Sequence, residues 1–113
     1  MNKKTILYIE NKSGGLSGDA IIGRVKYSAS GKTIIYKNKE FRSLKGHGYK
    51  ANYYEINSGD HYWISGCRKD GRDALYNNNV TIDADVREEY WKDIRKKGNN
   101  INMKIIKMKG KNK

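Results

Sequence analysis

The side chains best suited to nucleophilic chemistry are those of Cys67 and His61, which lie six residues apart. The pattern around them predicts that His61 belongs to a strand and that Cys67 follows that strand. If the strand continued through both residues, they would be separated by about 20 Å. A thiol nucleophile and its base need hydrogen-bond contact, so this spacing argues against a catalytic pair.

The other acids and histidines also lack a catalytic pattern. Glu55 and His61 share one face of a predicted hairpin, where one carboxylate and one imidazole more often form a surface pair. His47 stands between two glycines, and two histidines with scattered acids do not have the spacing of a metal site. No nucleophile, base and anion-binding group come together. We therefore expect a protein that is not an enzyme and that uses no cofactor and no metal.

Positive charge is the strongest feature of the composition. The 113 residues carry a formal net charge of +12. Residues 1–91 hold 15 Lys/Arg against 11 Asp/Glu, and residues 92–113 hold 9 against 1, so two-thirds of the excess lies in the last fifth of the chain. Such a charge favours nucleic acid (DNA or RNA) or an acidic protein as the partner, although a basic end is also often a solvated tail.

One predicted hairpin brings cations and an aromatic ring together. Residues 20–28 and 32–37 are expected to be strands joined by a three-residue turn, Ala29-Ser30-Gly31. In that register one face carries Val25, Tyr27, Thr33 and Ile35, and the other carries Arg24, Lys26, Lys32, Ile34 and Tyr36. Cations for phosphates beside a ring for a base are typical of nucleic-acid binding. The alternative is a solvated face on which Lys and Arg stems cover apolar surface.

Residues 32–50 extend this surface, because they carry a net charge of +5. Two aromatic residues of the following hairpin would supply further rings for stacking. The predicted nucleic-acid-binding residues are Arg24, Lys26, Lys32, Tyr36, Lys37, Lys39, Arg42, Tyr53 and Trp63. Binding through them should weaken steeply with salt.

The stretch from Asn52 to Gly66 predicts the hairpin around which the fold is organised. A three-residue loop, residues 57–59, ends in a glycine that can take a positive φ, and it pairs Ile56 with Asp60. We favour it over a two-residue loop because it gives the cleaner apolar face. That core face is Tyr54, Ile56, Tyr62 and Ile64. The opposite face, Tyr53, Glu55, His61 and Trp63, is either half-solvated surface or the docking site of a protein-interaction module (an accessory, immunity or inhibitor protein) for an acidic partner.

The remaining patterns predict a mainly β fold with one C-terminal helix. Residues 5–10 are apolar on both faces, as in a central strand, and Gly23 marks a bulge or a close approach. An Asp85-x-x-Glu88 capping box would open a helix over residues 83–97 that ends at Gly98. Its sheet-facing stripe is Val86, Tyr90, Trp91 and Ile94. We expect a strongly bent antiparallel sheet or a small, partly open barrel, Src-homology-like or oligonucleotide-binding-like.

The domain is predicted to span residues 1–98. Residues 99–113 form a basic tail, and its apolar cluster around Ile105 is a last strand, a partner-binding segment or disordered. The single cysteine, Cys67, excludes an internal disulfide and fits a reduced, cytoplasmic setting. No apolar run is long enough for a signal peptide or a membrane span, so no membrane partner is expected.

Several motifs resemble those of a family of small bacterial proteins without an established activity. The motifs are IENKSGGLSG, IGRV, YWISG, KDGRD and VREEYW, and the similarity spans roughly residues 6–94. Members of this family are sometimes labelled as deoxyxylulose-phosphate synthase. A thiamine-diphosphate synthase needs a far longer chain and a cofactor-binding apparatus that this sequence lacks. The resemblance therefore implies a compact bacterial domain and no particular mechanism, and the basic tail after Gly98 is an extension beyond it.

Overall fold

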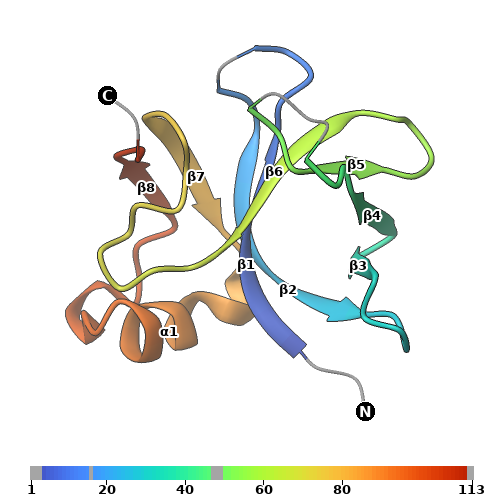
Figure 1. Cartoon of the computed structure of the whole chain (residues 1–113). Helices are drawn as coiled ribbons and strands as arrows, with labels where there is room; N and C mark the ends of the chain where they lie inside the picture. The colour runs from blue at the N-terminus through green and yellow to red at the C-terminus, as the bar shows by residue number, and fades with distance from the viewer. Residues whose placement is uncertain (1–3, 16, 47–49, 112–113) are drawn as a thin grey trace.

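The computed structural model describes residues 4–15, 17–46 and 50–111, so His47 lies outside the described residues. These residues form eight strands and one short helical segment (Figure 1). The strands are β1 Lys4–Asn11, β2 Ala20–Tyr27, β3 Thr33–Tyr36, β4 Lys39–Ser43, β5 Tyr53–Glu55, β6 His61–Gly66, β7 Asn78–Ile82 and β8 Ile105–Met108. The helical segment runs through η1 Ala84–Val86, α1 Arg87–Glu89 and η2 Tyr90–Ile94, and a separate turn, η3, spans Gly98–Asn100.

The first six strands close into an antiparallel barrel. Each strand pairs with the next along the chain, and β1 pairs with β6 as well as with β2. Closure gives every barrel strand two neighbours, which removes the exposed edges of an open sheet. The prediction of a mainly β fold, a small barrel with one C-terminal helix, is confirmed.

Strand β2 also carries a second layer of structure. Its residues Lys26 and Tyr27 pair with β3, whereas Ile21 and Ile22 pair in parallel with β7. Strand β8 then pairs antiparallel with β7. The segment predicted as a basic tail therefore supplies the last strand, which is one of the three alternatives left open for it.

Two hydrophobic clusters lie on opposite sides of β1 and β2. Leu7 and Val25 belong to the cluster inside the barrel. Tyr8 and Ile22 belong to an outer cluster that packs against β7, β8 and the helical segment. Successive side chains of a strand point to opposite faces, so both faces of β1 are buried, as its apolar pattern predicts. Burial of this outer cluster holds the second layer on the barrel.

The predicted register of the β5–β6 hairpin is wrong by one residue. The Glu55 N–H donates to the carbonyl of Asp60, so the loop has four residues, 56–59, instead of three. Gly59 closes it with φ 77°, the positive value expected for this glycine. The shift moves Tyr54 and Ile56 from the predicted core face to the outer face, where Ile56 is 42% exposed.

The observed register is explained by compensation of the Glu55 charge inside the barrel. Lys39 Nζ lies 3.6 Å from Glu55 Oε1, and Ser58 Oγ donates to the same oxygen. The neighbouring Tyr62 packs edge-on against Phe41, with ring centroids 4.7 Å apart. An apolar pattern cannot reveal a buried acid whose partners come from another strand and a turn, because burial of a charge is tolerated only where it is paired.

The β2–β3 hairpin shows the same error of one residue. Lys26 pairs with Ile35, so the connecting loop is 29–32. Ile34 therefore points into the barrel, whereas the sequence pattern had placed Thr33 and Ile35 there. Thr33 instead accepts a hydrogen bond on the outer face, from the Arg42 side chain at 3.2 Å.

The helical segment packs as predicted but begins and ends differently. Val86, Tyr90 and Trp91 are buried in the outer cluster, and Ile94 packs against it. No side-chain capping hydrogen bond opens the segment. Asp83 instead accepts a hydrogen bond from the Tyr36 hydroxyl, and Asp85 Oδ2 lies 3.9 Å from Arg24 Nε. Across the described part of the chain, no helix has the length and apolar character that crossing a membrane requires.

Gly23 is a close-approach position, one of the two roles predicted for it. A Cβ atom there would lie 2.6 Å from Cε1 of Tyr36 and 2.7 Å from Oδ2 of Asp83. The Tyr36 ring therefore crosses β2 next to the point where β2 and β3 separate.

Candidate functional site

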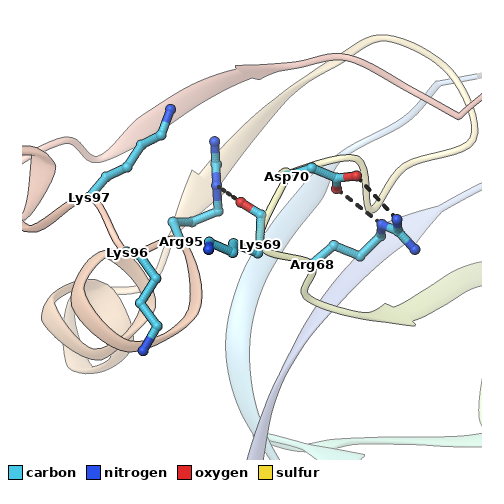
Figure 2. Close-up of a pocket in the computed structure, with 6 residues that line it drawn as sticks. All are labelled: Arg68, Lys69, Asp70, Arg95, Lys96 and Lys97. Carbon is cyan, nitrogen blue, oxygen red and sulfur yellow. Dashed lines mark hydrogen bonds and ion pairs between the residues drawn. The ribbon is translucent and has the colours of Figure 1, made fainter.

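A groove of about 770 Å³ lies between the loop after β6 and the end of the helical segment (Figure 2). Two runs of three consecutive residues form its walls, and five of these six side chains are cationic. The six residues, referred to below as the cationic groove, are Arg68, Lys69, Asp70, Arg95, Lys96 and Lys97.

The helical wall of the groove is shaped by an unusual helix end. The Arg95 N–H donates to the Tyr90 carbonyl at 2.9 Å, a bond across five residues, and the Lys97 N–H donates to the Trp91 carbonyl at 2.7 Å. Lys96 takes φ 57°, a left-handed conformation that costs a non-glycine residue about 1 kcal/mol or more. Helices usually place a glycine at such a position. The side chains of Lys96 and Lys97 leave this turn in opposite directions (Figure 2).

Arg95 connects the two walls. Its Nε donates to the Lys69 carbonyl and its Nη1 to the Tyr90 hydroxyl, each at 3.1 Å. The guanidinium carbon lies 5.2 Å from the ring centroid of Trp91, within the range of a cation–π contact. A Cβ atom on Gly71 would lie 2.6 Å from that carbon, so a side chain at residue 71 would displace the guanidinium from this position. The guanidinium is therefore held in place before any ligand arrives.

The groove keeps a large uncompensated positive charge. The one acid, Asp70, accepts two hydrogen bonds from the Arg68 guanidinium at 3.0 and 3.1 Å. These bonds lower the pKa of Asp70 to about 2, so it stays ionised and neutralises Arg68. The other four cations of the groove form no ion pair with any described residue. Four positive charges therefore remain for an anionic ligand.

Asp73 anchors the loop wall from inside the fold. Its Oδ1 accepts the Arg68 N–H at 2.7 Å, and its backbone carbonyl accepts Trp63 Nε1 at 2.9 Å and Ser65 Oγ at 2.8 Å. Its Oδ2 has no hydrogen-bond partner among the described residues, and burial raises the pKa of this carboxyl. Burial, together with the nearby Asp73, also raises the pKa of the Cys67 thiol well above its usual range. Cys67 is therefore a packing thiol and not a thiolate nucleophile at neutral pH.

The structure distributes the nine residues of the predicted nucleic-acid surface over several faces. Given the observed registers, Arg24, Lys26 and Arg42 lie on the outer face of the barrel, and Lys32 and Lys37 lie in turns. Tyr36, Lys39 and Tyr53 point to the barrel interior or its open end, and Trp63 packs against the outer cluster. Arg24 is already paired, because its Nη2 lies 2.7 Å from Glu89 Oε1. These nine residues do not form one surface.

The three rings predicted to stack on bases are engaged within the fold. The Tyr36 hydroxyl donates to Asp83, and the Tyr53 ring packs at the barrel cluster. The Trp63 indole donates to the carbonyl of Asp73, as described above. Lys26 on β2 and Arg42 on β4 both stay exposed on the outer face, with β3 between the two strands.

The alternative docking face is divided by the corrected register. Tyr53 pairs with Tyr62 across β5 and β6, and Glu55 shares their barrel-facing side. His61 and Trp63 alternate with Tyr62 along β6 and therefore point to the outer side. The four predicted residues lie on two faces, because the loop contains one more residue than expected.

The sequence contained both halves of the cationic groove but not their contact. Residues 95–97 are three consecutive cations at the end of the predicted helix, and residues 67–79 are a charged stretch after the predicted hairpin. No periodicity connects a loop to a helix end so far along the chain. The feature that could have suggested the contact is Gly71, because a glycine between charged residues permits another group to approach closely.

Comparisons of the chain with protein-family models, with curated proteins and with solved structures find no significant match. In residues 4–15, 17–46 and 50–111, no group of three or more His, Cys, Asp or Glu side chains is placed to hold a metal ion. The function is therefore argued from the geometry and charge of the site itself.

Proposed function

We propose that this protein is a nucleic-acid-binding module and that the cationic groove contacts the phosphate backbone. The observation that supports the proposal is that four uncompensated cations, from two separate segments, line one groove. Cations that neutralise phosphates release condensed counterions, which supplies most of the affinity in binding that does not depend on base sequence.

The surroundings of the groove favour a long polyanion over a single acidic side chain. From Arg95 to Lys111 the chain holds seven Lys/Arg and no Asp/Glu. Strand β8, which belongs to this stretch, keeps the Lys107 side chain exposed on the outer layer. Positive charge therefore continues from the groove along the outer layer, as a bound phosphate backbone requires.

The absence of aromatic residues from the groove's lining distinguishes this proposal from a protein-docking site. All six lining residues are charged, whereas the centres of protein interfaces are usually anchored by aromatic or other apolar side chains. Tyr90 and Trp91 lie under Arg95 and are buried. Binding should therefore depend on phosphates and be largely independent of base identity.

The proposal fixes the expected salt dependence. If all four uncompensated cations contact phosphates, the slope of log K against log salt concentration is about −3.6 on duplex DNA and about −2.8 on single strands. Fluorescence anisotropy with labelled 20-nucleotide single and double strands, from about 50 to 300 mM salt, measures both slopes.

A pair of matched double variants tests the location. Lys69→Ala/Lys97→Ala removes two groove cations and should reduce the duplex slope by about 1.8. Lys26→Ala/Arg42→Ala removes two exposed cations from the barrel's outer face and should leave the slope nearly unchanged. A larger loss in the second variant would move the binding surface to the barrel face. Salt-independent binding, or no binding by the native chain, would refute the proposal.

A further inference from the structure

The open end of the barrel contains a second cavity, which differs from the cationic groove in composition. It has a volume of about 330 Å³ and lies where β2 and β3 separate. Ile9 and Ile21 form apolar wall, and three aromatic rings, those of Tyr36, Phe41 and Tyr62, line it as well. Aromatic and aliphatic walls of this kind are typical of pockets that bind a small group.

The cavity is lined by one acid, Asp19, and one cation, Lys39, and the charge that remains uncompensated there is acidic. Asp19 lines it, is exposed, and forms no hydrogen bond or ion pair through its carboxylate within the described part of the chain. Asp60 adjoins it and accepts a hydrogen bond from Asn11, another lining residue, at 3.3 Å. The one lining cation, Lys39, is paired with Glu55 inside the barrel. Two carboxylates thus remain uncompensated here, on a chain whose net charge is +12.

We propose that this cavity, the barrel mouth, binds a lysine or arginine side chain of a protein partner. The aliphatic stem of such a side chain would pack on Ile21, which is half-buried. Its cationic head would lie over the half-buried ring of Tyr36, whose face is negative, within reach of Asp19. Charge complementarity selects a basic partner over an acidic one, because the ammonium group of Lys39 is already neutralised by Glu55.

This inference does not depend on the proposed nucleic-acid contact. The barrel mouth and the cationic groove share no residue, and they carry opposite charge. Each site can therefore fail its test while the other passes. The protein would present a basic surface to nucleic acid and an acidic, ring-lined pocket to a basic protein.

The test is an NMR titration of the full chain, labelled with ¹⁵N, with three small probes. The first is N-acetyl-lysine-N-methylamide. The second is N-acetyl-norleucine-N-methylamide, which keeps the apolar stem without the ammonium group, and the third is the corresponding glutamate derivative. We expect the lysine probe to bind with a dissociation constant in the millimolar range, about fivefold more tightly than norleucine.

Two further readouts locate the bound probe. Shifts should concentrate at the backbone amides of Asp19, Tyr36 and Tyr62, and the ε-methylene protons of the probe should move upfield through the ring currents. Asp19→Asn keeps the shape of an exposed side chain and should weaken the lysine probe about threefold, with no effect on norleucine.

Each other result overturns the inference. Equal binding of norleucine would show a pocket that reads only the apolar stem, and preference for glutamate would show that Lys39 dominates. Shifts outside the barrel mouth, or no shifts at about 50 mM lysine probe, would show that the cavity takes no cationic side chain.

Discussion

Replacing Lys96 by glycine should stabilise the protein while weakening its binding to nucleic acid. Lys96 has φ 57°, where an L-residue pays about 1–2 kcal/mol and glycine does not. Glycine loses about 0.5–1 kcal/mol more backbone entropy on folding than a residue with a side chain. The difference leaves a net gain of about 0.5–1 kcal/mol, or about 3 °C in melting temperature for a domain of this size.

The same substitution removes one of the four uncompensated cations of the cationic groove. Loss of one phosphate contact should make the slope of log K against log salt concentration less negative by about 0.9 on duplex DNA. At about 0.1 M salt this corresponds to roughly fivefold to tenfold weaker binding. Because Lys96→Gly makes the fold more stable, the lost affinity cannot be attributed to unfolding. The measurements are urea denaturation and the anisotropy salt series described above.

Lys45→Gly provides the matched control. Lys45 has φ 53° and is exposed in the connection after β4. Figure 1 shows β4 on the opposite side of the molecule from α1. Lys45→Gly should give a similar gain in stability and remove one charge from the chain, without changing the salt slope. If Lys96→Gly weakens binding no more than Lys45→Gly, the cationic groove is not the phosphate site. If neither variant gains stability, the left-handed conformations carry no cost.

Three further substitutions test how the cationic groove is held in shape. Gly71→Ala places a methyl group 2.6 Å from the Arg95 guanidinium carbon, at a residue with φ 75°. It should lower the free energy of unfolding, measured by urea denaturation, by about 2 kcal/mol and weaken duplex binding severalfold. Unchanged binding would show that Arg95 is not needed in its present position. Asp73→Asn removes a buried carboxyl whose pKa is raised above its ordinary 3.8. A group of this kind stabilises the fold below about pH 4, where it is protonated, and this stabilisation is lost as the pH rises through the folded-state pKa. The variant should therefore gain about 1 kcal/mol over the native chain at pH 7 and nothing at pH 3 in denaturation curves, and a loss at pH 7 would contradict this reasoning. Arg68→Gln should raise the pKa of Asp70 from about 2 toward 3.8, which NMR titration of the carboxyl carbon measures, and an unchanged value would assign the low pKa to another group.

The registers of the two hairpins show where reasoning from sequence failed. The β5–β6 hairpin was placed one residue off because a three-residue loop gave the cleaner apolar face. The β2–β3 hairpin was placed one residue off because Ala29-Ser30-Gly31 has the chemistry of a three-residue turn. The barrel instead accepts Glu55 in its interior, since Lys39 and Ser58 compensate it. The ion pair of Glu55 with Lys39 joins this hairpin to β4, so the residue pattern of the hairpin alone cannot reveal it. The consequence was functional, because each slip changed which side chains share a surface.

Local patterns were sufficient for the mainly β class, the two buried faces of β1, and the stripe of the helical segment that packs on the sheet. At Gly23 they left a bulge and a close approach as the two alternatives. Each of these follows from side-chain periodicity or from the conformational freedom of glycine, and both are written into neighbouring residues. Charge content also followed from composition alone.

Tertiary structure alone decided which charges lie together. The cationic groove exists because Arg95 is clamped between the loop after β6 and the rings beneath it. The acidic barrel mouth exists because β2 pairs with β7 along one half and with β3 along the other. Such sites depend on distances between residues far apart in the chain, and these distances are set only when the barrel closes and the second layer packs on it.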